Sequence, residues 1–196
     1  MHKTRLEAFS DGVMAVLITV LVLELKVPHA HELQALGAVA PVFCAYALSF
    51  VFIGIYWNNH HHLLHAAENV NGRILWANLH LLFWLSLIPF TTAWMGESHL
   101  APWPTALYGV VLLGAGVAYL ILQTSLVKHQ GAHSHLATAL GRDRKGKASA
   151  VLYALAVGLA FVQPVASAVI YALVAMMWFV PDRRIESTLA SLDRTD

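Results

Sequence analysis

Two clusters of histidines are the residues whose type and spacing are best suited to chemistry in this sequence. One cluster occupies residues 60–65 and the other residues 129–135. His61 and His65 are four residues apart, as are His129 and His133, so each pair would share one face of a helix. Paired imidazoles are common ligands of zinc and iron. These four histidines are therefore the candidate metal ligands of the chain.

The rest of the histidine pattern argues against a metal enzyme. Di-iron desaturases of membranes repeat HxxxH and HxxHH boxes, and no HxxHH sequence occurs here. Imidazole titrates near neutral pH, so partly solvated histidines at a membrane surface also explain both clusters. We expect neither a bound metal nor a cofactor.

Asp11 is an ionisable residue at the start of a long apolar run, in the stretch RLEAFSDGVMAVLITVLVLEL. Ionisable groups inside a membrane span are costly and by default mark function. Three interpretations stay open: a hydrogen-bonded staple between helices, a carboxylate that handles protons or ions, and a helix start exposed to water. A second apolar run ends in WNNHHHLLH, so Asn58, Asn59 and His61 are predicted to meet Asp11 at the same depth.

Common catalytic and nucleic-acid-binding patterns are missing from the sequence. It contains no Walker loop, no HExxH zinc site and no GxSxG nucleophile elbow. The net charge of +1 provides no broad basic surface for a nucleic acid. Cys44 is the only cysteine, which excludes an intrachain disulfide and a cluster of thiolate ligands. We expect no enzymatic activity and no nucleic-acid partner.

The composition places all these residues in an integral membrane protein. Of the 196 residues, 58% are hydrophobic and only 12% are charged, whereas soluble domains carry about 25% charged residues. Glu7 and Asp11 interrupt the basic start and no A-x-A site follows, so the first apolar run is a retained helix and not a signal peptide. We expect an all-α fold with one six-helix domain over residues 1–196. Its predicted spans are residues 5–25, 33–57, 74–95, 105–127, 148–163 and 164–180. The last two form either a tight hairpin or a single kinked helix.

The distribution of basic residues sets the predicted orientation. With the N-terminus in the cytoplasm, the 58–73 and 128–147 loops and the C-terminal tail are also cytoplasmic. These regions hold eleven of the twelve lysines and arginines, and only Lys26 falls outside them. An excess of basic residues is typical of cytoplasmic loops. We therefore expect a multi-pass protein of a bacterial-type inner membrane with both termini in the cytoplasm.

The first predicted helix has two distinct sides. At about 100° per residue, Ser10 and Asp11 lie opposite a smooth stripe. That stripe consists of Gly12, Val16, Thr19 and Leu23, bordered by Val20. By spacing alone such a stripe is a lipid-facing or packing surface, and periodicity does not identify it as the wall of a pore.

The segment RLEAFSD, residues 5–11, resembles the RxxxFSD signature of the transmembrane protein 175 family of potassium channels. The similarity is greatest to prokaryotic members, which have one six-helix unit per chain. It continues through FSDGVMAVLITVLVLEL, WNNHHHLLH and NLHLLFWLSLIPF, while the last three spans match only in hydropathy.

This resemblance implies a homotetrameric potassium channel in the lipid bilayer, with the first helices lining a central pore. The family lacks the TVGYG filter and uses a hydrophobic constriction instead. Carried onto this sequence, the constriction falls on Val16, with Val20 and Leu23 further along and Thr19 as a polar layer. Arg5, Phe9, Ser10 and Asp11 would fix the helix against its neighbours, although Arg5 lies near enough to the stripe to sit at the cytoplasmic mouth. Many relatives have isoleucine or leucine at the constriction, so a ring of smaller valines would be wider, and the ion selectivity stays open.

Two other functions remain possible at this stage. A proton- or metal-coupled transporter would use Asp11 and the histidine clusters, and inverted repeats would favour it, but none is visible. A membrane scaffold that transports nothing would tolerate any apolar substitution in the stripe.

Overall fold

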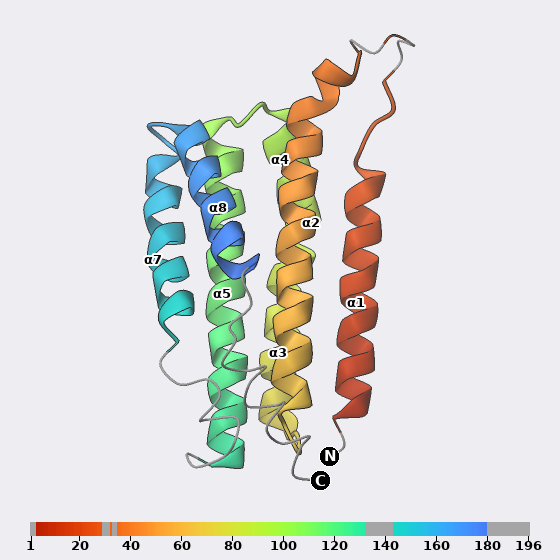
Figure 1. Cartoon of the computed structure of the whole chain (residues 1–196), viewed down its shortest axis with the longest axis vertical. Helices are drawn as coiled ribbons and strands as arrows, with labels where there is room; N and C mark the ends of the chain where they lie inside the picture. Colours follow the sequence, from red (N-terminus) through yellow and green to blue (C-terminus); the bar gives the residue numbers. More distant parts are fainter. Residues whose placement is uncertain (1–2, 29–31, 33–34, 132–142, 180–196) are drawn as a thin grey trace.

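The computed structural model describes residues 3–28, 32, 35–131 and 143–179, and all regular structure within them is helical. The helices lie side by side and the chain reverses direction at most connections (Figure 1). They are α1 (Thr4–Leu23), α2 (Ala35–His65), α3 (Gly72–Ser86), α4 (Ile88–Glu97), α5 (Pro102–Gln130), α7 (Arg144–Leu159) and α8 (Pro164–Phe179). The all-α prediction is thus confirmed.

Four helical stretches of the described chain are long and apolar enough to cross a membrane. They are Thr4–Leu23, Val39–His65, Gly72–Glu97 and Pro102–Gln130. These four correspond to the first four predicted spans. The described parts of α7 and α8 have 16 residues each, about 24 Å at 1.5 Å per residue. That length is short of a hydrocarbon core of about 30 Å. Residues 33–34 and 180, at the edges of two predicted spans, lie outside the described residues.

The third predicted span is interrupted, and proline explains the break. α3 ends at Ser86 and α4 begins at Ile88, with Leu87 capping both. Pro89 has no N–H to donate, and its ring opposes the carbonyl four residues earlier, so the α3 ladder cannot run through it unchanged. At the other end of α3, the Asn71 side chain accepts a hydrogen bond from the Ile74 N–H at 3.0 Å and caps the helix.

α7 and α8 form an antiparallel hairpin, so the alternative of one kinked helix is wrong. The Ser167 hydroxyl of α8 donates to the Ala156 carbonyl of α7 at 2.8 Å. Further along, the Trp178 indole N–H donates to the Ser149 hydroxyl at 2.8 Å. The short turn between them ends at Pro164, which begins α8.

The ends of the helices separate the basic residues as the sequence predicted. The starts of α1, α3 and α7 and the end of α5 lie at one end of the bundle (Figure 1). Lys3, Arg73, Lys128 and Lys147 belong to that end, whereas Lys26 follows α1 at the opposite end.

A buried polar cluster joins three helices in the middle of the bundle. The Ser49 hydroxyl of α2 lies 2.6 Å from that of Thr92 in α4 and 2.9 Å from that of Tyr108 in α5. Thr92 itself donates to the Ile88 carbonyl, so Ser49 donates to Thr92 and Tyr108 donates to Ser49. Side-chain hydrogen bonds between helices contribute about 0.6 kcal/mol on average in membranes. This cluster fixes the frame against which α1 packs.

Candidate functional site

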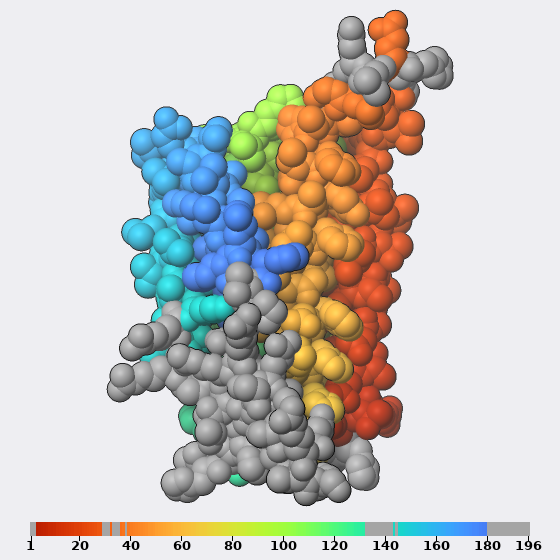
Figure 2. Space-filling view, viewed as in Figure 1, coloured from red at the N-terminus to blue at the C-terminus, as the bar shows by residue number. Residues whose placement is uncertain are grey.

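α1 divides into a buried side and an exposed side along its whole length. The buried side consists of Leu6, Ser10, Met14, Leu17 and Leu21. The exposed side carries the predicted stripe: Val16 is 59% exposed, Val20 36% and Leu23 75%. Gly12 and Thr19 are exposed as well, and the space above Gly12 is open to at least 4 Å. α1 forms one edge of the molecule (Figure 2). In a single chain the stripe is therefore an uncovered surface.

Ser10, in the middle of the FSD motif, belongs to a hydrogen-bonded chain behind that surface. Its hydroxyl donates to the Leu6 carbonyl at 2.8 Å and accepts from the Asn78 amide of α3 at 2.9 Å. The Asn78 oxygen lies 2.7 Å from Nε2 of His60 in α2. Ser10, Asn78 and His60 are all at most 1% exposed.

The direction of this chain of bonds fixes the tautomer of His60. Asn78 uses its NH₂ group toward Ser10, so its oxygen faces the histidine and must accept. His60 therefore carries its proton on Nε2. Each donor in this chain of bonds has an acceptor, and the chain joins α1, α3 and α2 at one point.

Asp11 makes its contact with α2, but not through the predicted partners. Its Oδ1 accepts a hydrogen bond of 3.0 Å from the indole N–H of Trp57. Asn59 instead donates to the Ile55 carbonyl at 2.8 Å, and His61 stacks on Trp57 with the ring centroids 6.1 Å apart. The prediction of Asn58, Asn59 and His61 as partners was wrong because the side chain one turn before His61 reaches Asp11 first.

Arg5 and Phe9 share the exposed side of α1 with the stripe. Phe9 is 53% exposed, and Arg5 is exposed at the start of the helix. Neither side chain is buried against another helix of its own chain, so the two halves of the RxxxFSD motif face in different directions. Ser10 and Asp11 hold α1 to the bundle, whereas Arg5 and Phe9 extend the uncovered face toward the N-terminal end.

A lysine at each end of α1 bonds to another helix. Lys3 Nζ donates to the carbonyls of Leu64, at 2.9 Å, and His65, at 2.6 Å, at the end of α2. A cation at that position also interacts favourably with the negative end of the helix dipole. Beyond the other end of α1, Lys26 pairs with Glu97 of α4. The Glu97 carboxylate raises the pKa of Lys26 through this hydrogen bond and its charge.

The candidate metal ligands do not assemble into a metal site in the described part of the chain. No group of three or more potential ligands comes together there. The His61 and His65 rings stack nearly parallel with centroids 6.0 Å apart, and His129 Nδ1 lies 3.1 Å from the Asn71 amide. His133 lies outside the described residues.

The sequence-based reading missed Asn78, His60 and Trp57 as partners of the motif. One signal could have identified Asn78, because it is an amide within an apolar span and such residues face other helices. The interior position of His60 had no such signal, because His61, His62 and His65 follow it closely and the sequence does not show which of the four faces the other helices.

Comparison with known proteins identifies relatives along the whole chain. The family model described as endosomal/lysosomal potassium channel TMEM175 matches residues 5–89, which include α1 from Arg5 onward and the contacts of Ser10 with Asn78 and of Asp11 with Trp57. A Chryseobacterium protein named as a potassium channel is 49% identical over 189 residues, covering 96% of this chain and 98% of that protein.

A solved structure and a vertebrate protein extend these relationships. The crystal structure of a lysosomal potassium-selective channel TMEM175 homolog from Chamaesiphon minutus matches with a TM-score of 0.79 and 28% identity, covering 91% of this chain and 96% of that one. A rat protein named endosomal/lysosomal proton channel TMEM175 is 38% identical over 96 residues, which are 42% of this chain and 19% of the rat protein.

Proposed function

Because the chain belongs to the TMEM175 family, we propose that it is a potassium-permeable cation channel. The pore is formed by four copies of the chain, with α1 of each copy lining the central axis. Relatives that align along nearly the whole chain are named as potassium channels, which supports the choice of ion. Selectivity for potassium over sodium is modest, because no carbonyl filter of the TVGYG type is present in the sequence.

The two-sided character of α1 is the observation that carries this proposal. Its buried side is anchored by Ser10 and Asp11, so its opposite side is held in a fixed orientation along the edge of the bundle. The exposed side of α1 is uncovered in a single chain, and a closed ring of identical chains would enclose it. The stripe then becomes the wall of a shared pathway.

The constriction of this pathway is apolar. Val16 forms the narrowest ring, with Val20 and Leu23 further along and Thr19 as a polar layer between them. A narrow ring of valines hinders ions because water is unstable in it and an ion must lose part of its hydration shell to pass. Arg5 lies at the cytoplasmic mouth, where its charge influences the entry of cations.

The protein resides in the inner membrane with its termini in the cytoplasm. The described basic residues at one end of the bundle support this orientation. Lys26 alone among the described basic residues lies at the other end, where its charge is paired with Glu97.

The test is potassium flux into liposomes that contain the purified full-length protein, with sodium flux measured in parallel. Val16→Asn should change the potassium flux, because it places a polar amide in the constriction. Val151→Asn on α7 is the matched control, since Val151 is 60% exposed and Val16 is 59% exposed. Equal fluxes for the wild type and both variants would exclude Val16 from the pathway.

Proton transport is the second candidate, and the name of the rat relative favours considering it. Asp11 is the carboxylate of the RxxxFSD motif, and a proton carrier would depend on it. Flux that follows a pH gradient, requires Asp11 and ignores Val16→Asn would replace the channel proposal by this one.

A further inference from the structure

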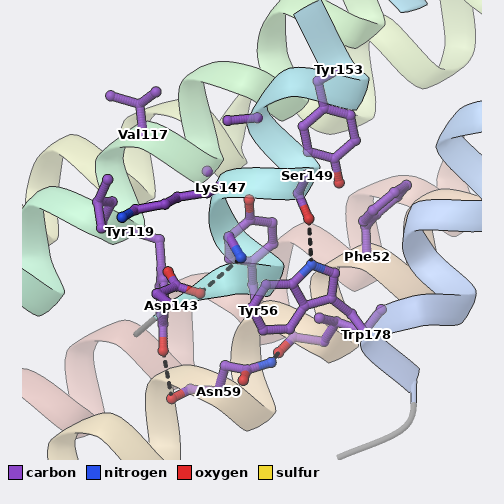
Figure 3. Close-up of a pocket in the computed structure, with 15 residues that line it drawn as sticks. Phe52, Tyr56, Asn59, Val117, Tyr119, Asp143, Lys147, Ser149, Tyr153 and Trp178 are labelled. Carbon is purple, nitrogen blue, oxygen red and sulfur yellow. Dashed lines mark hydrogen bonds between the residues drawn. The ribbon is translucent and has the colours of Figure 1, made fainter. Parts of the chain in front are cut away.

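A cavity of about 120 Å³ lies inside the bundle, on the side of α2 that faces away from α1. Its walls come from α2, α5, α7 and the end of α8, and none of the stripe residues contributes to it. Figure 3 shows Phe52, Tyr153 and Trp178 around this space. Most of its lining is aliphatic or aromatic, so it favours an apolar occupant.

Two tyrosine hydroxyls in this cavity have no hydrogen-bond partner among the described residues. Tyr153 is only 3% exposed, and its hydroxyl is directed toward Ser149 and Phe52 without a bond to either (Figure 3). Tyr56, which is half-buried, also lines the cavity. The neighbouring Tyr119 differs, since it donates to the Asn59 carbonyl at 3.1 Å. A hydroxyl that faces an apolar cavity without a partner can still form a hydrogen bond, so an occupant with a polar group would bond there.

The charges at the rim limit the charge of that occupant. Asp143 and Lys147 both line the cavity, and their charges are opposite. One oxygen of Asp143 is already used, because it accepts from the Gly146 N–H at 2.8 Å and caps α7. Among the described lining residues these two charges offset each other, which favours an uncharged occupant.

We propose that this cavity binds a small uncharged aromatic molecule with one hydroxyl group, of the size and chemistry of phenol. Its ring packs edge-on or offset against the aromatic walls. Its hydroxyl donates to one tyrosine oxygen and accepts from the O–H of the other, so each tyrosine hydroxyl gains one hydrogen bond. The volume agrees with this class, because apolar cavities of about 150 Å³ hold a benzene ring.

The test uses 4-fluorophenol and the full-length protein in micelles, followed by fluorine NMR. We expect saturable binding of one molecule per chain. Fluorobenzene, which can make neither of the two hydrogen bonds, should bind about 5- to 150-fold more weakly. The readout involves no ion flux, so its failure would leave the channel proposal untouched.

Two variants separate binding in the cavity from partition into detergent. Tyr153→Phe should lower the preference for 4-fluorophenol over fluorobenzene by about two- to tenfold, the range set by one hydrogen bond, while leaving the ring contacts in place. Gly116→Val fills the cavity, since the nearest atom to an added Cβ there is the Tyr56 hydroxyl at 3.8 Å. Gly158→Val on the same bundle is the control, because nothing lies within 4 Å of that position.

Loss of saturable binding in Gly116→Val with retention in Gly158→Val supports the proposal. Binding signals that never saturate would overturn the proposal and leave water as the occupant. So would equal signals from the wild type, Gly116→Val and Gly158→Val. If Tyr153→Phe keeps the same preference for 4-fluorophenol over fluorobenzene, the proposal is also overturned. This outcome is decisive even if Gly116→Val fails to fold.

Discussion

Ser10→Ala should destabilise the protein far more than Ser86→Ala, although the two serines look alike locally. Each hydroxyl donates to a carbonyl of its own helix, Ser10 to Leu6 at 2.8 Å and Ser86 to Phe83 at 2.7 Å. Only Ser10 also accepts a bond, from the Asn78 amide of another helix. Ser86 is exposed, whereas Ser10 is completely buried.

The magnitude follows from what the substitution leaves behind. Alanine at position 10 leaves one N–H of Asn78 without an acceptor in a place that water does not reach. An unsatisfied buried donor costs about 1–3 kcal/mol, and interhelical bonds measured in a membrane protein reach about 1.7 kcal/mol. We expect Ser10→Ala to lower the unfolding free energy by about 1–2 kcal/mol. Ser86→Ala should stay within about 0.5 kcal/mol of the wild type.

Equilibrium unfolding in mixed micelles with increasing dodecyl sulfate, followed by circular dichroism, measures both changes. A double-mutant cycle with Asn78→Ala isolates the pair, and the second substitution should cost less when Ser10 is already absent. Equal destabilisation by Ser10→Ala and Ser86→Ala would refute the reasoning. Additive costs of Ser10→Ala and Asn78→Ala would show that the two side chains do not act on each other.

Other substitutions probe the packing and the charges around this network. Gly109→Ala should destabilise by about 1–3 kcal/mol, because its Cβ would overlap the Tyr171 hydroxyl; Gly158→Ala, at an open position, should be neutral or slightly stabilising in the same unfolding assay. Asp11→Asn keeps an acceptor for the Trp57 N–H, so it should be milder than Asp11→Leu, which loses that bond and about 0.5–1.5 kcal/mol; equal losses would exclude the bond as the reason. Glu97→Gln should have a small effect on the unfolding midpoint that vanishes in high salt, because the Lys26–Glu97 pair is exposed. Chelators should leave potassium flux unchanged, since the described residues form no group of three metal ligands, and inhibition by a chelator would contradict this.

Much of the fold was predictable because a membrane restricts the choices. Long apolar runs identified the first four spans, and the positions of basic residues agreed with the observed ends of the bundle. The break at Leu87 was less accessible, because SL-x-PF reads as a continuous apolar segment until Pro89 is weighed against the carbonyl it opposes. The hairpin of α7 and α8 was ambiguous for a similar reason, since the turn between them has few residues.

The sequence predicted the two faces of α1 but not the contacts behind them. The helical periodicity alone places Ser10 and Val16 on different faces of α1, because the face of a residue depends only on the geometry of its own helix. The partners Trp57, His60 and Asn78 depend on how three helices are rotated and offset along their axes, and shifting α2 by one residue would replace Trp57 with Asn58. Such offsets are set by many packing contacts together, which no local pattern records.

The anchors of α1 are unevenly distributed along the helix, and this has a consequence for the proposed gate. Lys3, Ser10 and Asp11 all bond within the first eleven residues of the chain. From Val13 to Leu23, α1 is held by the apolar contacts of Met14, Leu17 and Leu21, and the next polar tie is the exposed pair of Lys26. Packing between apolar side chains in lipid has little hydrophobic driving force and depends on close contact. The N-terminal part of α1 is therefore fixed in rotation by directional bonds, while the part that carries Val16, Val20 and Leu23 can tilt at lower cost. In the proposed tetramer, a gate at these residues would change its width without breaking the network that orients them toward the axis.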